Sequence, residues 1–340
     1  MYEFSMTEEQ QLLLESIDEF MERGDYAEYF KECDHAQKYP QKACDDYCEA
    51  GYHMLALPEE YGGDDLDLVS NVLMNVRIYE HGWPALTLPG SFLQVDNILT
   101  YGTKEQQDII IGEAKAGRKA YTLGFTEPQA GSDSKAITTR AVKRNGKVYI
   151  TGHKSFISHA MVCEKMMTAC IDDNGGVTLY LVPLKAPGVT MEDVHKIGLK
   201  CSTTCEVYLD NVEVEETDRF GPEGGGFKCL MENYGYERLI IAAQALGYAE
   251  CAYEDAMAYA NQREQFGKPI AGFQLTQQKA LEMYIAIENM RNLLYEGAWS
   301  LDQGIDDRVL PNAAKYYCTR EGFKVIDDAM SIMGGIGCTD

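Results

Sequence analysis

The order in which hydrophobic rhythms change along the chain restricts its fold more than any single motif. Apolar residues recur at helical spacing in the first third. Short β-branched and aromatic runs separated by turns follow, and long helical periods return at the end. This order predicts an α+β fold that is mainly α. We expect an N-terminal helical domain over residues 1–119, an antiparallel, β-barrel-like middle domain over 120–225 and a C-terminal helical bundle over 226–340.

Local signals indicate where individual elements begin and turn. Thr7 and Gln10 form a capping-box pattern ahead of an apolar helical stripe. Asn145 and Gly146 separate two alternating runs, as in a two-residue hairpin turn. The glycine triplet 224–226 is not followed by the lysine and serine or threonine of a phosphate-binding loop, so we expect a flexible entry to the next helix.

Charge and composition limit the partners of the chain. It has 54 acidic and 30 basic residues, and this formal net charge of −24 disfavours binding to nucleic acid and to anionic membranes. No apolar run is long enough for a membrane-spanning helix. The first residues lack the basic start and the apolar core of a signal peptide. We therefore expect a cytoplasmic protein.

The cysteines predict neither a metal site nor a disulfide framework. There are 11 of them, an odd number, and they are scattered along the chain. Cys44 and Cys48 are separated by three residues rather than two, as are Cys201 and Cys205, and only six histidines accompany them. In a reducing compartment such residues act as small buried hydrophobic groups.

The stretch GFTEPQAGSDSK, residues 124–135, combines features of a turn and of a ligand site. Pro128 and Gly131 tighten the chain, so that the backbone can approach another molecule closely. Thr126, Ser132 and neighbouring N–H groups can donate hydrogen bonds to a planar or phosphorylated ligand. The alternative is a capped turn that leads into a hairpin, and local chemistry alone leaves both interpretations open.

Three stretches together resemble the acyl-CoA dehydrogenase family: FTEPQAGSD, GKVYITGHKSFIS and NQREQFGKPIAGFQ. They occur in the family's order, and the resemblance covers essentially the whole chain. EYFKECDHAQKYP and CAYEDAMAYANQREQFG further resemble family members that reduce crotonobetainyl-CoA, a carnitine-derived thioester. The resemblance implies FAD as cofactor and an acyl-CoA or enoyl-CoA thioester as substrate.

The same resemblance implies which residues bind the cofactor. Thr126 matches a residue that hydrogen-bonds the flavin ring, and Phe156 matches an aromatic residue that flanks it. Arg263, Phe266 and Gln274 match residues that reach the FAD of a neighbouring subunit, which implies a homo-oligomer, either a dimer or a tetramer. A guanidinium group suits a pyrophosphate well. The implied FAD-binding set is Leu123, Phe125, Thr126, Ser132, Phe156, Ser158, Arg263, Phe266, Gln274, Gly334 and Gly335.

The resemblance also suggests a catalytic base. Most family members place this glutamate beyond the C-terminal glycine turn, whereas the present sequence ends at Asp340, which suggests a truncated product. A subset places it on the first long C-terminal helix, just before an arginine. Glu237 and Arg238 match that position, with Glu237 as the base and Arg238, like Ser132, at a substrate-binding position. The alternative is an exposed surface pair without a role. Gly235 replaces a substrate-contacting aspartate that is common in the family.

The predicted function is that of an acyl-CoA dehydrogenase or enoyl-CoA reductase that exchanges electrons with electron-transfer flavoprotein. Tyr234, Tyr236 and Tyr248 are candidates to hold a trimethylammonium head group by cation–π contact, although core packing explains them equally well. Two alternatives remain open. One is an acyl-CoA oxidase that uses oxygen, and the other is a non-catalytic or partner-completed acyl-CoA-binding subunit.

Overall fold

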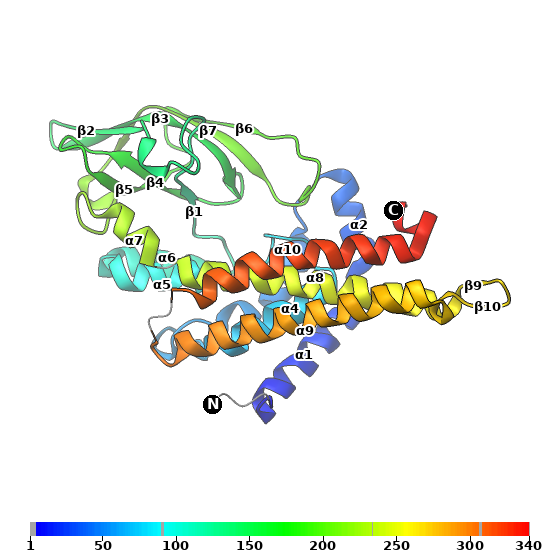
Figure 1. The fold of residues 1–340 in the computed structure, drawn as a ribbon. Coiled ribbons are helices and arrows are strands. Elements are labelled where there is room, and N and C mark those ends of the chain that lie inside the picture. The colour runs from blue at the N-terminus through cyan, green and yellow to red at the C-terminus, as the bar shows by residue number, and fades with distance from the viewer. Residues whose placement is uncertain (1–4, 90–91, 233, 306–307, 340) are drawn as a thin grey trace. The chain divides into compact units, whose positions relative to one another are not determined.

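The chain contains helices, then a sheet, then long helices, in the predicted order (Figure 1). The predicted capping box is confirmed, since Thr7 accepts a hydrogen bond from the Gln10 N–H at 3.1 Å. The computed structural model describes residues 5–89, 92–232, 234–305 and 308–339. None of the helices in these ranges combines the length and the apolarity that crossing a membrane requires.

Two compact units share the chain, and each combines segments that are distant in sequence. The unit called helical here comprises Met1–Tyr29, Leu66–Trp83 and Gly235–Asp340. The unit called mixed comprises Phe30–Asp65 and Pro84–Tyr234. The division at residues 119 and 225, which follows sequence rhythm, remains a prediction.

Long amphipathic helices build the helical unit around a core of aliphatic and alanine side chains. Asp302 accepts hydrogen bonds from the Leu68 and Val69 N–H groups, at 2.9 Å each, and so satisfies donors that the first turn of a helix leaves free. The main elements are α1 (Glu8–Gly24), α4 (Leu68–Glu80), α8 (Tyr234–Gln262), β9 (Glu264–Gln265), β10 (Lys268–Pro269), α9 (Gln274–Asp302), α10 (Leu310–Met333) and the 3-10 turn η6 (Gly334–Cys338).

The mixed unit contains the sheet. Its strands are β1 (Tyr121–Gly124), β2 (Arg140–Arg144), β3 (Lys147–Ser158), β4 (Lys165–Ile171), β5 (Val177–Pro183), β6 (Val189–Asp193), β7 (Thr204–Val214) and β8 (Arg219–Phe220). Its helices are α2 (Tyr26–Ala36), whose first turn belongs to the helical unit, α3 (Gln41–Glu49), α5 (Phe92–Tyr101), α6 (Lys104–Lys115) and α7 (Gly226–Glu232). Short 3-10 turns are η1 (Tyr52–Met54), η2 (Glu59–Tyr61), η3 (Ser134–Ala136), η4 (Glu216–Asp218) and, in the helical unit, η5 (Ile270–Gly272).

The strands follow the order β6-β7-β3-β2-β4-β5-β8, with β1 attached to β4. Most pairings are antiparallel, as predicted, but β1 pairs with β4 in parallel, as does Arg140 of β2 with Ile171. Asn145 and Gly146 both have positive φ, 52° and 78°, in the tight turn between β2 and β3, as the hairpin signal predicted.

The central strands β4 and β5 are buried on both faces. Alternate side chains of β4, such as Met167 and Ala169, pack into a core with α5, α6 and α7. Met166 and Cys170, on the opposite face of β4, pack into a second core with β2, β3 and β7. Near-continuous apolar strands such as these are typical of a sheet covered on both sides.

The glycine triplet 224–226 leads into α7, as predicted, but it also packs closely against β5. A Cβ on Gly226 would lie 2.8 Å from Cγ of Leu179, and the Gly224 N–H donates to Thr178 Oγ1 at 2.7 Å. The glycines therefore allow a close backbone approach. All 11 cysteines are free, and the described residues contain no group of three or more potential ligands that is arranged to hold a metal ion.

Candidate active site

The TEP turn, residues 126–128, is organised by a buried carboxylate. The backbones of Glu127 and Ala130 exchange hydrogen bonds of 3.1 and 3.0 Å, which close the turn. Glu127 Oε2 accepts from the Thr138 N–H at 2.7 Å and from its hydroxyl at 2.8 Å, while Oε1 accepts from the Thr139 N–H at 3.0 Å. Gln129 Nε2 adds a further donor at 2.6 Å. The turn is therefore tied to the segment that enters β2.

Lys154 of β3 completes this arrangement. Its ammonium group donates to Glu127 Oε1 at 2.8 Å and to the Phe125 carbonyl at 3.2 Å, and its side chain is fully buried. Burial alone would raise the pKa of Glu127, but donors from Lys154, Thr139 and Thr138 lower it to about 2. Glu127 is therefore ionised at neutral pH.

An irregularity in β3 turns Phe156 outward. The register between β3 and β7 shifts between Lys154 and Ile157, and Phe156 there has φ 57°. Strict alternation from the inward-facing Lys154 would direct Phe156 into the core, yet it is 64% exposed. Positive φ is rare for an aromatic residue and persists only where the surroundings impose it. The Phe156 ring is therefore not part of the buried face of the strand.

The TEP turn and the β3 irregularity are directly connected. The Ser155 N–H donates to the Thr126 carbonyl at 2.9 Å. Further along, Thr122 Oγ1 donates to the Ser158 carbonyl at 2.5 Å. These two hydrogen bonds hold the segment 122–126 beside the segment 155–158, although about thirty residues separate them in the sequence. Phe156 lies between the two bonded residues of β3 and is exposed.

The other predicted cofactor residues of the mixed unit differ in accessibility. Leu123, Thr126 and Ser158 are half-buried and Ser132 is exposed. Phe125 is only 8% exposed and packs against Phe227, with 6.4 Å between ring centroids. The Phe125 side chain therefore belongs to the core, which leaves its backbone as the part that can meet a ligand.

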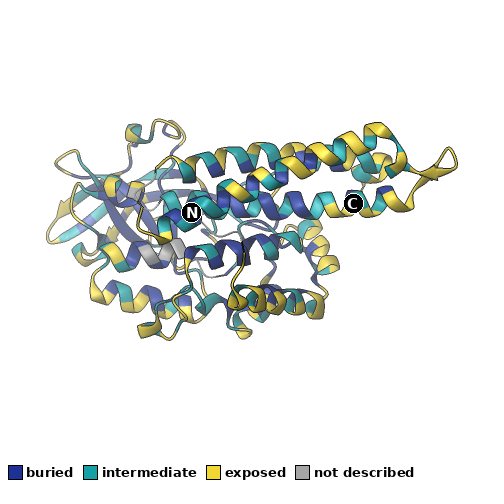
Figure 2. Ribbon diagram, turned by 60° about the horizontal axis from the view of Figure 1, so that its bottom comes forward, coloured by how far each residue is buried: buried dark blue, intermediate teal, exposed yellow. Residues whose placement is uncertain are grey.

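The β9–β10 hairpin of the helical unit is exposed, and Figure 2 shows it in yellow. Arg263, directly before β9, and Phe266, in the turn, are both exposed. Phe266 and Gly267, with φ 53° and 78°, form the tight turn, and Phe266 is 95% exposed. The Arg263 guanidinium makes no hydrogen bond or ion pair with any residue that the structure describes. Gln274, also exposed, begins α9. An apolar ring and a free cation at one exposed hairpin suit a contact with another molecule.

Glu237 and Arg238 lie in the first turns of α8, in the helical unit. Both side chains are half-buried. Burial raises the pKa of Glu237, and the charges of Arg238 and Lys315 oppose that shift. A carboxylate with a raised pKa is suited to accept a proton near neutral pH. Glu237 is therefore not the fully exposed surface group that the alternative interpretation assumed.

The remaining predicted residues of the helical unit are less uniform. Tyr248 donates from its hydroxyl to the Trp83 carbonyl at 2.6 Å and packs edge-on against Tyr79, so it serves the internal packing of this unit. Tyr236 is half-buried, as is Tyr234, the last residue of the mixed unit. Gly334, with φ 65°, and Gly335 are exposed, and a Cβ at either would meet no atom within 4 Å.

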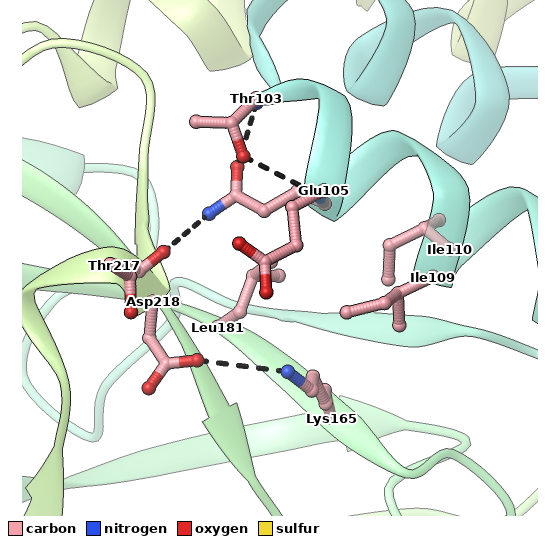
Figure 3. A pocket seen from close by; sticks show the side chains of 9 residues that line it. Thr103, Glu105, Ile109, Ile110, Lys165, Leu181, Thr217 and Asp218 are labelled. Atoms are coloured by element: carbon pink, nitrogen blue, oxygen red, sulfur yellow. Dashed lines mark hydrogen bonds and ion pairs between the residues drawn. The ribbon is translucent and has the colours of Figure 1, made fainter.

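A separate surface pocket of about 230 Å³ lies beside the first turns of α6 (Figure 3). Glu105, Lys165 and Asp218 supply its charged groups, and the Lys165 ammonium lies 3.7 Å from the Asp218 carboxylate. Ile109 and Leu181 contribute apolar surface. None of the predicted site residues lines it, so it is distinct from the TEP turn and the β3 irregularity.

Comparison with known proteins identifies the family. The acyl-CoA dehydrogenase N-terminal, middle and C-terminal domain models match residues 7–117, 122–212 and 224–340. The chain therefore belongs to the acyl-CoA dehydrogenase family. It is a flavin-dependent oxidoreductase that acts on CH–CH groups, and its cofactor is FAD.

Individual relatives agree with this assignment. The probable acyl-CoA dehydrogenase YdiO of Escherichia coli strain K12 is 43% identical over 344 residues, which cover 99% of this chain and 90% of that protein. The solved structure of butyryl-CoA dehydrogenase from Megasphaera elsdenii has a TM-score of 0.93 at 31% identity, covering 99% and 91% of the two chains. A structure of the electron transferring flavoprotein of Acidaminococcus fermentans has a TM-score of 0.90 at 31% identity, covering 99% and 90%.

The residues at the TEP turn and the β3 irregularity fit FAD. Phe156 offers an exposed ring for stacking on a planar ring system, on a backbone with the positive φ that aromatic residues rarely adopt. Ser158 carries a hydroxyl donor two residues after Phe156, and Thr126, whose carbonyl accepts from the Ser155 N–H, carries another. Ser132, in the segment that follows the TEP turn, adds a third hydroxyl group. The sequence motif identified these residues, whereas the buried pair of Glu127 and Lys154 beneath them went unnoticed. Its one signal was a lysine at an inward position of a strand.

Proposed function

We propose that this chain interconverts an acyl-CoA and its α,β-enoyl-CoA, with Glu237 as the proton-transferring base. The observation that carries the proposal is a half-buried carboxylate with a raised pKa in the first turn of α8. Glu237 lies directly before an arginine, at the position where, by the resemblance described above, a subset of family members carries the base. Burial holds the pKa of Glu237 above that of an ordinary glutamate, as a base for a weakly acidic α-proton requires.

In oxidation, the Glu237 carboxylate takes a proton from the α-carbon while a hydride leaves the β-carbon and the double bond forms. FAD, when bound, supplies the hydride acceptor. Arg238 orients the base and contacts the substrate. Leu123, the Phe125 backbone, Thr126, Ser132, Phe156 and Ser158 hold the flavin, and Ser132 also contacts the thioester. Reduction of the enoyl-CoA uses the same groups in reverse.

The base assignment is tested by anaerobic mixing of the FAD-loaded protein with a saturated acyl-CoA. We expect the flavin absorption of the wild-type protein to bleach, and Glu237→Gln to slow bleaching by roughly 10²–10⁴-fold while the thioester still binds. Glu254→Gln, an exposed residue on the same helix, is the matched control and should bleach normally. Bleaching of Glu237→Gln at the wild-type rate would remove Glu237 from this role.

We further propose that the chain is an oligomer, a dimer or tetramer, in which Arg263, Phe266 and Gln274 of one subunit reach the FAD of another. The exposed Phe266 ring and the unpaired Arg263 support this arrangement. Gly334 and Gly335 lie along the adenosine half of the cofactor. We also propose that the protein is located in the cytoplasm.

Electron-transfer flavoprotein is the proposed electron partner, as the similarity to an electron transferring flavoprotein structure supports. We propose a short-chain acyl-CoA or enoyl-CoA as the substrate class. The specific reaction that we propose is the reduction of crotonobetainyl-CoA. Tyr234 and Tyr236, on either side of Gly235 and next to Glu237, would face the trimethylammonium group. Equal affinity for crotonobetainyl-CoA and crotonyl-CoA would exclude that specificity. Rapid reoxidation of the reduced flavin by oxygen would identify an oxidase instead.

A further inference from the structure

The ion pair of Glu127 and Lys154 is unusual because stability alone does not account for it. Its Oε1–Nζ distance is 2.8 Å, and the two side chains are 1% and 0% exposed. Removing two charges from water costs free energy that their attraction seldom exceeds, and apolar side chains of similar volume often replace such a pair without loss. The pair therefore calls for a role beyond filling the core.

The hydrogen bonds of this pair reach the backbone on both sides of the predicted flavin site. Lys154 donates to the carbonyl of Phe125, directly before Thr126, at 3.2 Å. Glu127 directly follows Thr126 and accepts from the Thr138 and Thr139 N–H groups. The main chain at Thr126 is thus held from both neighbours.

The other half of the site depends on the same lysine. Lys154 is the last residue in register before the irregularity that exposes Phe156. Directly after it, the Ser155 N–H donates to the Thr126 carbonyl at 2.9 Å. An aromatic residue at φ 57° keeps that backbone only where its neighbours are fixed. Ser155, directly before Phe156, is held by its bond to Thr126, and the Lys154 side chain before it is held by Glu127 and the Phe125 carbonyl.

We infer that Glu127 and Lys154 are positioning residues that hold Thr126 and Phe156 at the spacing needed to grip the flavin ring between two chain segments. Neither side chain reaches the surface, so both act through the backbone of their neighbours. This inference rests on the placement of FAD against Thr126 and Phe156 that the proposed function assumes.

The test is a double variant, Glu127→Gln with Lys154→Met, which removes both charges at nearly constant volume. The single Lys154→Met change leaves a buried, unpaired carboxylate and is prone to misfolding. We expect the double variant to keep its far-UV circular dichroism and a thermal midpoint within about 4 °C of the wild type. Its Kd for FAD should rise by roughly tenfold or more, and the visible circular dichroism of the bound flavin should change.

The control is Asp172→Asn in the turn between β4 and β5. Asp172 is also buried, and it accepts from the Asn174 and Gly176 N–H groups and from the Thr178 hydroxyl. This variant should lower the thermal midpoint without changing the affinity for FAD or the flavin spectrum. A double variant with wild-type affinity and spectrum would overturn the inference.

Phe156→Ala distinguishes this failure from failure of the proposed site. If Phe156→Ala weakens FAD binding and the double variant does not, the flavin site stands and the positioning role falls. If neither change affects FAD binding, the flavin lies elsewhere, and both the placement and the positioning role are overturned.

Discussion

Arg291 of α9 donates to the carboxylate of Glu250 of α8 over 2.6 Å, and this contact lies inside the helical unit. Glu250 is only 5% exposed. Burial raises its pKa to about 7, with a further contribution from Glu80, while Arg291 and Arg77 oppose the shift. Glu288 and Tyr295 of α9 complete the charged and titratable surroundings. Glu250 therefore titrates near neutral pH.

The stability of the protein should consequently contain a pH-dependent contribution from Glu250. The folded state binds the Glu250 proton more tightly than the unfolded chain, so stability from this group is present below about pH 4.5 and is lost as pH rises through 7. The full loss amounts to roughly 3 kcal/mol. Urea unfolding between pH 4.5 and 8 should show a smaller decline for Glu250→Gln than for the wild type. Identical slopes would contradict this assignment.

The pH dependence of flavin reduction should report Glu237. The base must be ionised, so the rate of bleaching by an acyl-CoA should rise with pH through a value above the ordinary glutamate range. Lys315 lowers the pKa of Glu237, and Lys315→Met should therefore move this rise to higher pH. Lys324→Met, on the same helix, should leave the profile unchanged. A profile that Lys315→Met does not move would show that another group is the base.

Phe156 should lower the stability of the apoprotein while it raises the affinity for FAD. Asparagine tolerates positive φ far better than an aromatic residue, and the exposed ring buries little surface. Phe156→Asn should therefore raise the unfolding free energy of the apoprotein by roughly 0.5–1 kcal/mol, since it relieves backbone strain. The same change should weaken FAD binding. Phe156→Tyr keeps both ring and strain and should change neither quantity, and an apoprotein destabilised by Phe156→Asn would refute the strain argument.

Arg263 should act on the cofactor of a neighbouring subunit. Because Arg263 makes no ion pair within the described chain, Arg263→Ala should leave the apoprotein as stable as the wild type while weakening FAD binding. Co-expression of Arg263→Ala with Phe156→Ala should restore FAD binding in hybrid oligomers, since some sites then combine two intact halves. Arg144→Ala, at the exposed end of β2, should bind FAD normally. Hybrids without any recovered site would place Arg263 and Phe156 in the same subunit's site or remove Arg263 from it.

Sequence rhythm predicted the long helices and the longer strands because burial imposes a period of 3.6 on a helix and of two on a strand. The turn at Asn145 was also predictable, since Asn-Gly accepts positive φ readily. The orientation of Phe156 was not predictable by period, because the irregularity after Lys154 reverses the alternation within β3. β9 and β10 could not be predicted, because strands of two residues are too short to show a period.

The candidate site was proposed from motif resemblance, since local chemistry left a capped turn and a ligand site both open. Thr126 and Phe156 prove to be adjacent through a single backbone hydrogen bond at Ser155, a relationship that no pattern of residue types encodes. The buried pair of Glu127 and Lys154 was missed for a related reason. A glutamate in a turn and a lysine in a strand are ordinarily solvated, and only the folded chain brings them together away from water.

The double-sided burial of β4 and β5 makes the middle of the sequence dependent on what precedes and follows it. Met167, Ala169, Leu179 and Leu181 would lose their cover if α5, α6 and α7 were cut away. Residues 120–225, expressed alone, would therefore display an apolar face and aggregate rather than fold. The boundary that sequence rhythm draws near residue 119 separates two kinds of secondary structure, yet residues on both sides of it share one hydrophobic core.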